Sequence, residues 1–289
     1  MSDFMIATDS MADLPDDYVD EHGLGIMHLT YHVDGETYGK DRKLDWKTFY
    51  DRMRDGSTPT TSQVNPSDAR SCMEECLERT SKLLCLMFSA TLSGTYNSAV
   101  IAAEELMEER PGVQIQVVDT KAASLGEGLL VCRAVEMMES GCSMEETKDW
   151  VTDHIGNLVE VFTVEDLKYL YRGGRISRAA AAVGTVINLK PVLHIDNDGK
   201  LVAISKVRGR KKSLRALVDY MDEKMGRFRE ENRRVYITHG DALEEAEALA
   251  QEIRERFGIE DFMINRVGPT IGAHSGPGTM ALFFLGEER

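Results

Sequence analysis

Cysteine is scarce in this sequence and comes in an odd number. The chain of 289 residues contains five cysteines, scattered over a long stretch, which does not indicate a disulfide framework. Cys72 and Cys76 are four residues apart and would share one face of a helix. No histidine or second cysteine pair lies near them in the sequence, so we expect no metal site.

Long apolar runs are also missing. No stretch approaches the roughly 18–20 apolar residues that a membrane-spanning helix needs. The segment from Met1 to Asp9 lacks the basic flank and the apolar core of a signal peptide. We therefore expect a cytoplasmic protein, a monomer, with at most transient membrane contact.

Positive charge is in short supply across the chain as a whole. Lys and Arg number 34 against 49 Asp and Glu, which gives a formal net charge of −15. Such an acidic surface repels nucleic-acid phosphates and anionic lipid headgroups. We therefore expect no nucleic-acid partner.

One segment reverses this balance. Between Asp166 and Arg215 there are twelve basic residues and three acidic ones. The basic residues concentrate at Arg172 and Arg175 and again at Arg208, Arg210 and Lys211. A local inversion of this size favours a docking surface for an acidic partner or a phosphate ligand over an ordinary solvated face.

The first half of the chain alternates short apolar runs with helical patterns. The run from Leu83 to Phe88 is uninterrupted, as expected for a strand buried on both faces. Strand–helix–strand alternation indicates parallel pairing with right-handed crossovers. The predicted strands are 4–9, 83–88 and 113–119, and the predicted helices are 94–109, 125–140 and 144–154. A further helix is expected to begin at Asn65-Pro66, an N-cap residue followed by proline.

The pattern changes after about residue 158. Asn197-Asp198-Gly199-Lys200 is a turn sequence between two apolar runs, and it predicts a hairpin. A hairpin mixed with helices suggests a mixed or antiparallel sheet. The expected strands are 159–164, 191–195, 201–207, 235–239, 262–267 and 279–285, and the expected helices are 166–171, 177–183, 211–229 and 243–257. We predict an α/β protein with a parallel-sheet domain over residues 1–157 and a mixed domain over 158–289, whose last strand could return to the first domain.

A hydroxyl-rich loop precedes the helix predicted at Pro66. Four residues of Thr58–Gln63 carry hydroxyl groups, among them Thr61 and Ser62. Spacing alone does not separate a binding loop from an ordinary polar loop at this position.

A second polar loop, Ser89–Asn97, follows the apolar run 83–88 and opens a helix. The first amides of a helix lack intrahelical partners, and the helix dipole favours negative charge there. Ser93 and Gly94 are therefore candidates to hold a carboxylate or a phosphate. The alternative is that Ser93 merely caps the helix. The chain lacks the Gly-x-x-x-x-Gly-Lys phosphate loop.

The third loop is Gly268–Thr279, with four glycines and two prolines in twelve residues. Such a composition imposes a specific backbone path. His274 lies in its middle, and we interpret it as a functional histidine. His194 and His239 lie at strand ends and are interpreted as structural.

Taken together, these segments resemble the DegV family of bacterial proteins, some of which are the fatty-acid-binding subunits of fatty acid kinase. The resemblance runs along nearly the whole chain, and its motifs occur in the family's order. They are Ala7-Thr8-Asp9-Ser10, Thr60-Thr61-Ser62-Gln63, Leu92-Ser93-Gly94-Thr95-Tyr96, Val118-Asp119-Thr120-Lys121, Leu170-Tyr171-Arg172-Gly173-Gly174-Arg175-Ile176-Ser177, Lys206-Val207-Arg208-Gly209-Arg210-Lys211-Lys212 and Gly272-Ala273-His274-Ser275-Gly276-Pro277-Gly278. Val64 stands where the family usually has proline.

The resemblance implies two α/β domains with a long-chain fatty acid in an apolar tunnel between them. Hydroxyl groups at Thr61 and Ser93 would hold its carboxylate beside His274, with Ser62 and Gly94 adjoining. A separate fatty acid kinase would phosphorylate the bound acid, such as palmitate, stearate or oleate, to an acyl phosphate for phospholipid synthesis. The basic residues named above would face that kinase, and the chain itself would hold no catalytic residue and no cofactor.

Two other functions compete with this one. A hydrolase acting on a lipid ester could use Ser93 as nucleophile, His274 as base and Asp9 or Asp119 to orient the histidine. Ser93 lacks the Gly-x-Ser-x-Gly nucleophile elbow, which argues against this class. The other alternative is a binder of a different small acid, for which a short pocket would be the evidence.

Overall fold

The computed structural model describes residues 3–178 and 188–289 and divides them between two compact units. Of these residues, 3–30 and 62–155 form the first unit, and 31–61, 156–178 and 188–289 form the second. The predicted division assigned residues 1–157 to one domain. The structure instead joins Tyr31–Thr61 to the second unit.

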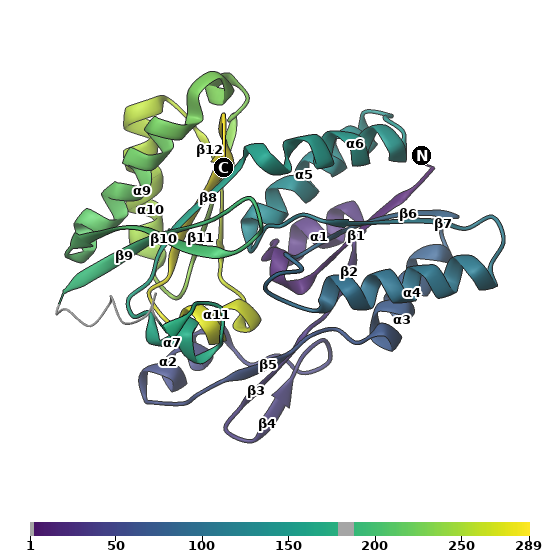
Figure 1. The fold of residues 1–289 in the computed structure, drawn as a ribbon, viewed down its shortest axis with the longest axis horizontal. Helices are drawn as coiled ribbons and strands as arrows, with labels where there is room; N and C mark the ends of the chain where they lie inside the picture. The colour runs from purple at the N-terminus through teal and green to yellow at the C-terminus, as the bar shows by residue number, and fades with distance from the viewer. Residues whose placement is uncertain (1–2, 179–187) are drawn as a thin grey trace. The chain divides into compact units, whose positions relative to one another are not determined.

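The first unit is built on a four-stranded parallel sheet in the order β2-β1-β6-β7 (Figure 1). Its strands are β1 (Met5–Asp9), β2 (Gly25–Met27), β6 (Lys82–Met87) and β7 (Gln114–Asp119). The chain runs from β1 outward to β2 and later returns to place β6 on the other side of β1. The direction of winding therefore reverses between β1 and β6, and the carboxyl ends of two such strands are where open α/β sheets bind ligands.

Helices cover both faces of this sheet. α3 (Pro66–Leu77) and α4 (Thr95–Glu109) pack on one face, and α5 (Leu125–Glu139) and α6 (Met144–His154) pack on the other. The short η1 (Ser10–Ala12) and α1 (Asp16–His22) connect β1 to β2. The parallel pairing and the strands and helices expected in this half are confirmed, with ends within two residues of the prediction.

The second unit contains a six-stranded mixed sheet in the order β10-β9-β8-β13-β11-β12. Only β11 and β12 pair in parallel. The strands are β8 (Leu158–Thr163), β9 (Leu189–Ile195), β10 (Leu201–Arg208), β11 (Arg234–His239), β12 (Asp261–Arg266) and β13 (Met280–Leu285). The predicted hairpin is β9–β10. The last strand lies between β8 and β11, so it does not return to the first unit.

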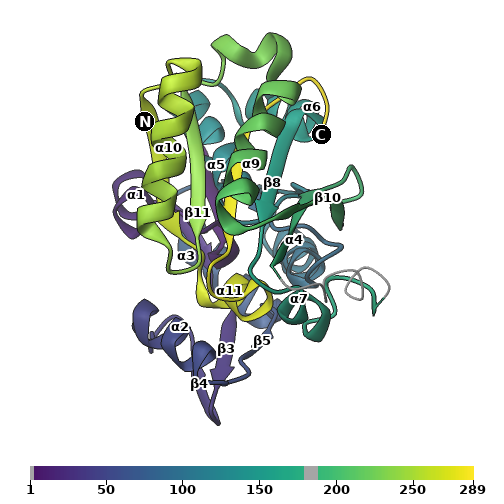
Figure 2. The same cartoon turned by 90° about the vertical axis from the view of Figure 1, so that its left-hand side faces the viewer.

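Two long helices, α9 (Arg210–Met225) and α10 (Leu243–Phe257), lie along one side of this sheet (Figures 1 and 2). Their buried faces, with Leu217 and Leu249 among them, form one core with strand residues such as Val161 and Phe284. The turn η2 (Ile155–Asn157) leads from α6 into β8, and the turn η3 (Gly226–Glu230) follows α9.

The segment 31–61 forms its own small layer. It contains α2 (Trp46–Arg54) and a three-stranded sheet of β3 (Thr30–Val33), β4 (Glu36–Tyr38) and β5 (Thr60–Ser62). Tyr31, Phe49 and Tyr50 pack in one cluster with Tyr169 and Ala273. The segment belongs to the second unit because this aromatic cluster buries its apolar side chains against residues more than a hundred positions later.

Two further helices border that layer. α7 (Lys168–Arg172) confirms the short helix predicted at 166–171, with its ends shifted by one or two residues. α11 (Pro269–Ser275) occupies what was predicted as an irregular loop. Pro269 at the first helical position starts α11, as its fixed backbone angle favours. The helix predicted at 177–183 lies largely outside the described residues.

Candidate carboxylate-binding site

Thr61 and His274 are in direct contact. Thr61 Oγ1 lies 2.8 Å from His274 Nε2, although 213 positions separate the two residues. Thr61 comes from β5 and His274 from the last turn of α11. Helix α11 sits close to α2, because a Cβ at Gly272 would lie 2.6 Å from the hydroxyl of Tyr50. That hydroxyl donates a hydrogen bond to the carbonyl of Val267, which fixes the start of α11.

His274 is neutral at physiological pH. Burial, and then the positive charges of Arg175 and Arg172, lower the pKa of His274 to about 4. Its Nδ1 is buried and has no hydrogen-bond partner in the structure. The ring is held against the backbone of Gly173, where a Cβ would lie 2.1 Å from Nδ1. A neutral ring with its proton on Nε2 donates to Thr61 Oγ1, which leaves the threonine hydroxyl proton for another acceptor.

The first basic motif adjoins this pair. Arg172 Nη1 donates to Thr58 Oγ1 at 3.2 Å, and its guanidinium lies over the ring of Tyr169. Arg175 donates to the carbonyl of Gly173, and burial lowers the pKa of Arg175. Two guanidinium groups thus supply positive charge around a neutral histidine, which suits an anionic ligand group.

Ser93 and Gly94 belong to the first unit, in the loop at the carboxyl end of β6. Gly94, not Ser93, is the N-cap residue of α4, and Ser93 Oγ accepts from Thr95 N at 3.3 Å. A Cβ at Gly94 would lie 2.2 Å from the side-chain oxygen of Gln63, so glycine is needed there. The amide of Val64 donates to Thr95 Oγ1 at 3.3 Å. A proline at position 64, usual in the family that the sequence resembles, could not make that bond.

Two carboxylates hold this loop in place. Asp9 Oδ2 accepts from Phe88 N at 3.1 Å, and Asp119 Oδ1 accepts from Ala90 N at 3.1 Å. Asp9 and Asp119 were considered above as orienters of a catalytic histidine. The hydrogen bonds that they accept come from backbone amides, Met11 and Phe88 for Asp9 and Ala90 and Lys121 for Asp119. Ser93 Oγ lies 3.0 Å from Thr95 Oγ1. These contacts are those of a positioned loop and do not resemble a catalytic triad.

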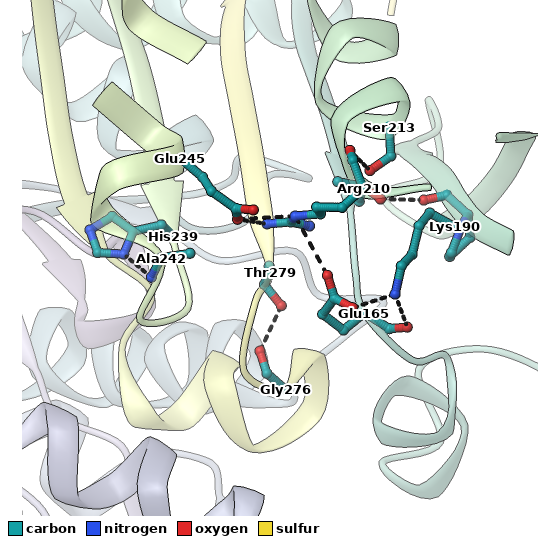
Figure 3. Close-up of polar contacts among 11 residues, drawn as sticks. Glu165, Lys190, Arg210, Ser213, His239, Ala242, Glu245, Gly276 and Thr279 are labelled. Atoms are coloured by element: carbon teal, nitrogen blue, oxygen red, sulfur yellow. Dashed lines mark hydrogen bonds and ion pairs between the residues drawn. The ribbon is translucent and has the colours of Figure 1, made fainter. Parts of the chain in front are cut away.

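The second basic motif divides into exposed and engaged residues. Arg208 at the end of β10 and Lys211 in α9 are exposed. Arg210 is not: its Nη2 lies 2.6 Å from Glu245, and its Nε lies 3.5 Å from Glu165. Figure 3 shows the Arg210 guanidinium between these two carboxylates. Arg210 therefore stabilises the unit, because its charge is neutralised within the fold.

A hollow of about 850 Å³ lies beside this ion-pair network at the carboxyl ends of β8 and β11. Most charged groups of its lining pair with one another or with neighbours. Asp241 contacts Arg54 at 2.6 Å, and Asp166 contacts Lys168 at 3.2 Å. Internal pairing of this kind explains the polar lining without a ligand.

The part of the chain that the structure describes contains no helix long and apolar enough to cross a membrane. Within the same residues, no group of three or more His, Cys, Asp or Glu side chains could hold a metal ion. All five cysteines are free thiols.

The model of the family described as "Uncharacterised protein, DegV family" matches residues 3–287. The chain belongs to the DegV family. A DegV domain-containing protein of Clostridium perfringens is 42% identical over 291 residues, which cover 100% of this chain and 99% of that protein.

Solved DegV structures share the fold. A DegV family protein from Thermus thermophilus is 33% identical to this chain, with a TM-score of 0.87. The match covers 99% of this chain and 100% of that one, and the Thermus protein is described as binding a fatty acid. A stearic acid-binding protein from Eubacterium ventriosum is 26% identical with a TM-score of 0.86, covering 98% of each chain. Both of these solved proteins are described as binding a fatty acid.

Proposed function

We propose that this DegV protein binds one long-chain fatty acid and presents its carboxylate to a separate fatty acid kinase, without catalysing the reaction itself. The observation that carries the proposal is the contact between Thr61 and the neutral, buried His274. A buried carboxylate must receive hydrogen bonds or it will be excluded or protonated. The hydroxyl of Thr61 is such a donor, and we propose that Ser93, with Ser62 and Gly94 beside these hydroxyls, completes the set.

The energetics favour a long acyl chain. Burying about sixteen carbons in a dry tunnel contributes on the order of 12 kcal/mol before the costs of binding. We propose that the acyl chain lies in such a tunnel, and that the protein works in the cytoplasm as a monomer. A neutral histidine and hydroxyl groups leave the carboxylate oxygens reactive, whereas a bidentate arginine clamp would oppose phosphorylation.

Mass spectrometry of the purified protein tests this function. We expect the native protein to carry added mass near one fatty acid per chain, and denaturation to release a free fatty acid of identifiable length. A protein that is free of lipid and stays so after incubation with palmitate, oleate and stearate would exclude the proposal. A covalently attached acyl group would instead support the hydrolase alternative.

The exposed cations make a separate prediction about the kinase. Arg208→Glu or Lys211→Glu is expected to slow acyl phosphate formation by an added fatty acid kinase, because the reversed charge repels an acidic partner surface. Binding of oleate, measured by calorimetry, should stay within about twofold of wild type, since surface substitutions change stability little. If oleate affinity falls as much as the rate of acyl phosphate formation, these residues lie at the lipid site and not at the kinase surface.

Arg210→Glu is a different kind of variant. It would add a third carboxylate beside Glu165 and Glu245, so we expect it to lower the stability of the fold itself. For that reason Arg210 does not serve as a test of docking, although its place in the sequence motif suggests one. We propose that Arg172 and Arg175 also take part in docking of the kinase.

A further inference from the structure

Two buried carboxyl groups lie behind the loop that carries Ser93. Asp9, at the carboxyl end of β1, is 1% exposed, and Glu127, in the first turn of α5, is 0% exposed. Thr8 Oγ1 donates to Glu127 Oε1 at 2.7 Å, whereas Glu127 Oε2 has no hydrogen-bond partner. Two buried negative charges this close, one of them with an unpartnered oxygen, would be costly, so the pair retains a proton under ordinary conditions.

The two groups differ in how firmly they hold a proton. Burial raises the pKa of Asp9 to about 7, against the lowering effect of the Met11 and Phe88 amides. Burial, and then the charges of Asp9 and Asp13, raise the pKa of Glu127 well above its usual range. Asp13, from the segment after η1, is the other charged group that faces the pair. Glu127 therefore stays protonated while Asp9 titrates near neutrality.

Asp9 connects this titration to the loop. Its Oδ1 accepts from Met11 N at 2.9 Å, and its Oδ2 accepts from Phe88 N. The loop folds back on Ser89, whose carbonyl accepts from Ser93 N at 3.1 Å. An ionised carboxylate accepts hydrogen bonds that are roughly twice as strong as those of a neutral acid. Ionisation of Asp9 thus tightens the start of the turn that places Ser93.

We propose that Asp9 is a positioning residue whose ionised carboxylate holds the Ser89–Gly94 loop in its binding conformation, so that fatty-acid affinity rises with Asp9 ionisation. This proposal rests on the function proposed above, since it concerns the same loop. Glu127 is the neighbouring acid that remains neutral. Asp9 touches no reacting atom and acts only through the loop.

The test compares Asp9→Asn with Glu127→Gln in the full-length, delipidated protein. The two variants make the same chemical change in the same cluster, but only the first removes the group that titrates. Oleate affinity is measured from pH 6 to pH 8.5. The Kd of each variant is divided by the Kd of wild type at the same pH, so that the effect of oleate ionisation cancels. We expect the ratio for Asp9→Asn to grow about fivefold over this range, and the ratio for Glu127→Gln to stay flat.

The outcomes separate the two proposals. If wild type binds no oleate at any pH, the proposed function fails. If wild type binds oleate and the Asp9→Asn ratio is flat, the fatty-acid function stands and the positioning role of Asp9 is overturned. A ratio that grows only for Glu127→Gln would also overturn the assignment to Asp9.

A measurement on wild type alone covers the case in which Asp9→Asn does not fold. Amide hydrogen exchange across Phe88–Gly94, expressed as protection factors, should show protection rising about fivefold between pH 6 and pH 8. Protection in β7, which lies in the same sheet, serves as the internal control. Equal behaviour of the two segments would contradict the proposal.

Discussion

His274→Ala is expected to weaken fatty-acid binding by about 10–100-fold while leaving the protein folded. The substitution removes the Nε2 contact that orients the Thr61 hydroxyl toward the ligand carboxylate, and a hydrogen bond from that hydroxyl to a charged group contributes about 1.5–3 kcal/mol. It also removes a buried Nδ1 that has no partner, so the loss of stability should be small. Calorimetry with oleate and thermal unfolding followed by circular dichroism measure the two quantities.

His194→Ala is the matched control. His194 lies in β9 of the same unit, burial lowers its pKa, and its Nδ1 is also buried without a hydrogen-bond partner. It belongs to none of the loops assigned to the ligand. Both alanine variants should therefore show similar changes in stability, and only His274→Ala should lose binding. Equal oleate occupancy in the two variants would remove His274 from the site.

Glu127→Gln is expected to stabilise the protein relative to wild type as the pH rises. Because burial raises the folded-state pKa of Glu127 above its unfolded value, the folded state binds a proton that the unfolded state loses above about pH 4.5. Wild type therefore loses stability with rising pH at about 1.4 kcal/mol per pH unit from this group, until the folded-state pKa is passed. Between pH 5 and pH 8 the free energy of unfolding of the variant, measured with urea, should therefore rise relative to that of wild type, because the variant lacks this titrating group.

Glu104→Gln controls for the loss of one negative charge. Glu104 is exposed on α4 in the same unit, so its substitution should change the free energy of unfolding equally at both pH values. Burial lowers the pKa of His274, so this group makes the free energy of unfolding rise with pH. That contribution is the same in wild type and in both variants, so it cancels when they are compared. A constant difference between Glu127→Gln and wild type would mean that Glu127 is ionised in the folded state.

Local patterns in the sequence were sufficient for most of the secondary structure. The uninterrupted apolar run at 83–88 predicted β6 because a strand buried on both faces needs no polar alternation. Asn65-Pro66 marked the start of α3, where the Asn65 side chain accepts from Asp68 N. Signals of this kind lie within a few residues of the element that they specify.

Long-range placement was not accessible in the same way. The strands β3, β4 and β5 have three or four residues each, too few for a periodic pattern. Their attachment to the second unit depends on an aromatic cluster that contains both Phe49 and Ala273, which no local pattern encodes. The pairing of Thr61 with His274 was expected from family resemblance and not from spacing.

The sequence did not predict that Asp9 and Glu127 form a buried pair. Acidic residues are common in the first turn of a helix, where they interact favourably with the helix dipole, so the position of Glu127 gives no local signal of burial. Asp9 was noticed only as a possible orienter of a histidine. Its burial follows from its place at the inner strand β1, which becomes visible only once the order of the sheet is known.

The discontinuity of the second unit limits how the protein can be dissected. The chain passes between the units after Thr30, after Thr61 and after Ile155, so no single cut yields both units intact. A fragment of residues 158–289 would contain His274 but lack Thr61, and it would leave α11 without the tyrosine hydroxyl that anchors its first turn. Neither half is a transferable module, and exchange of lipid specificity between relatives by splicing at residue 157 should give insoluble chimeras.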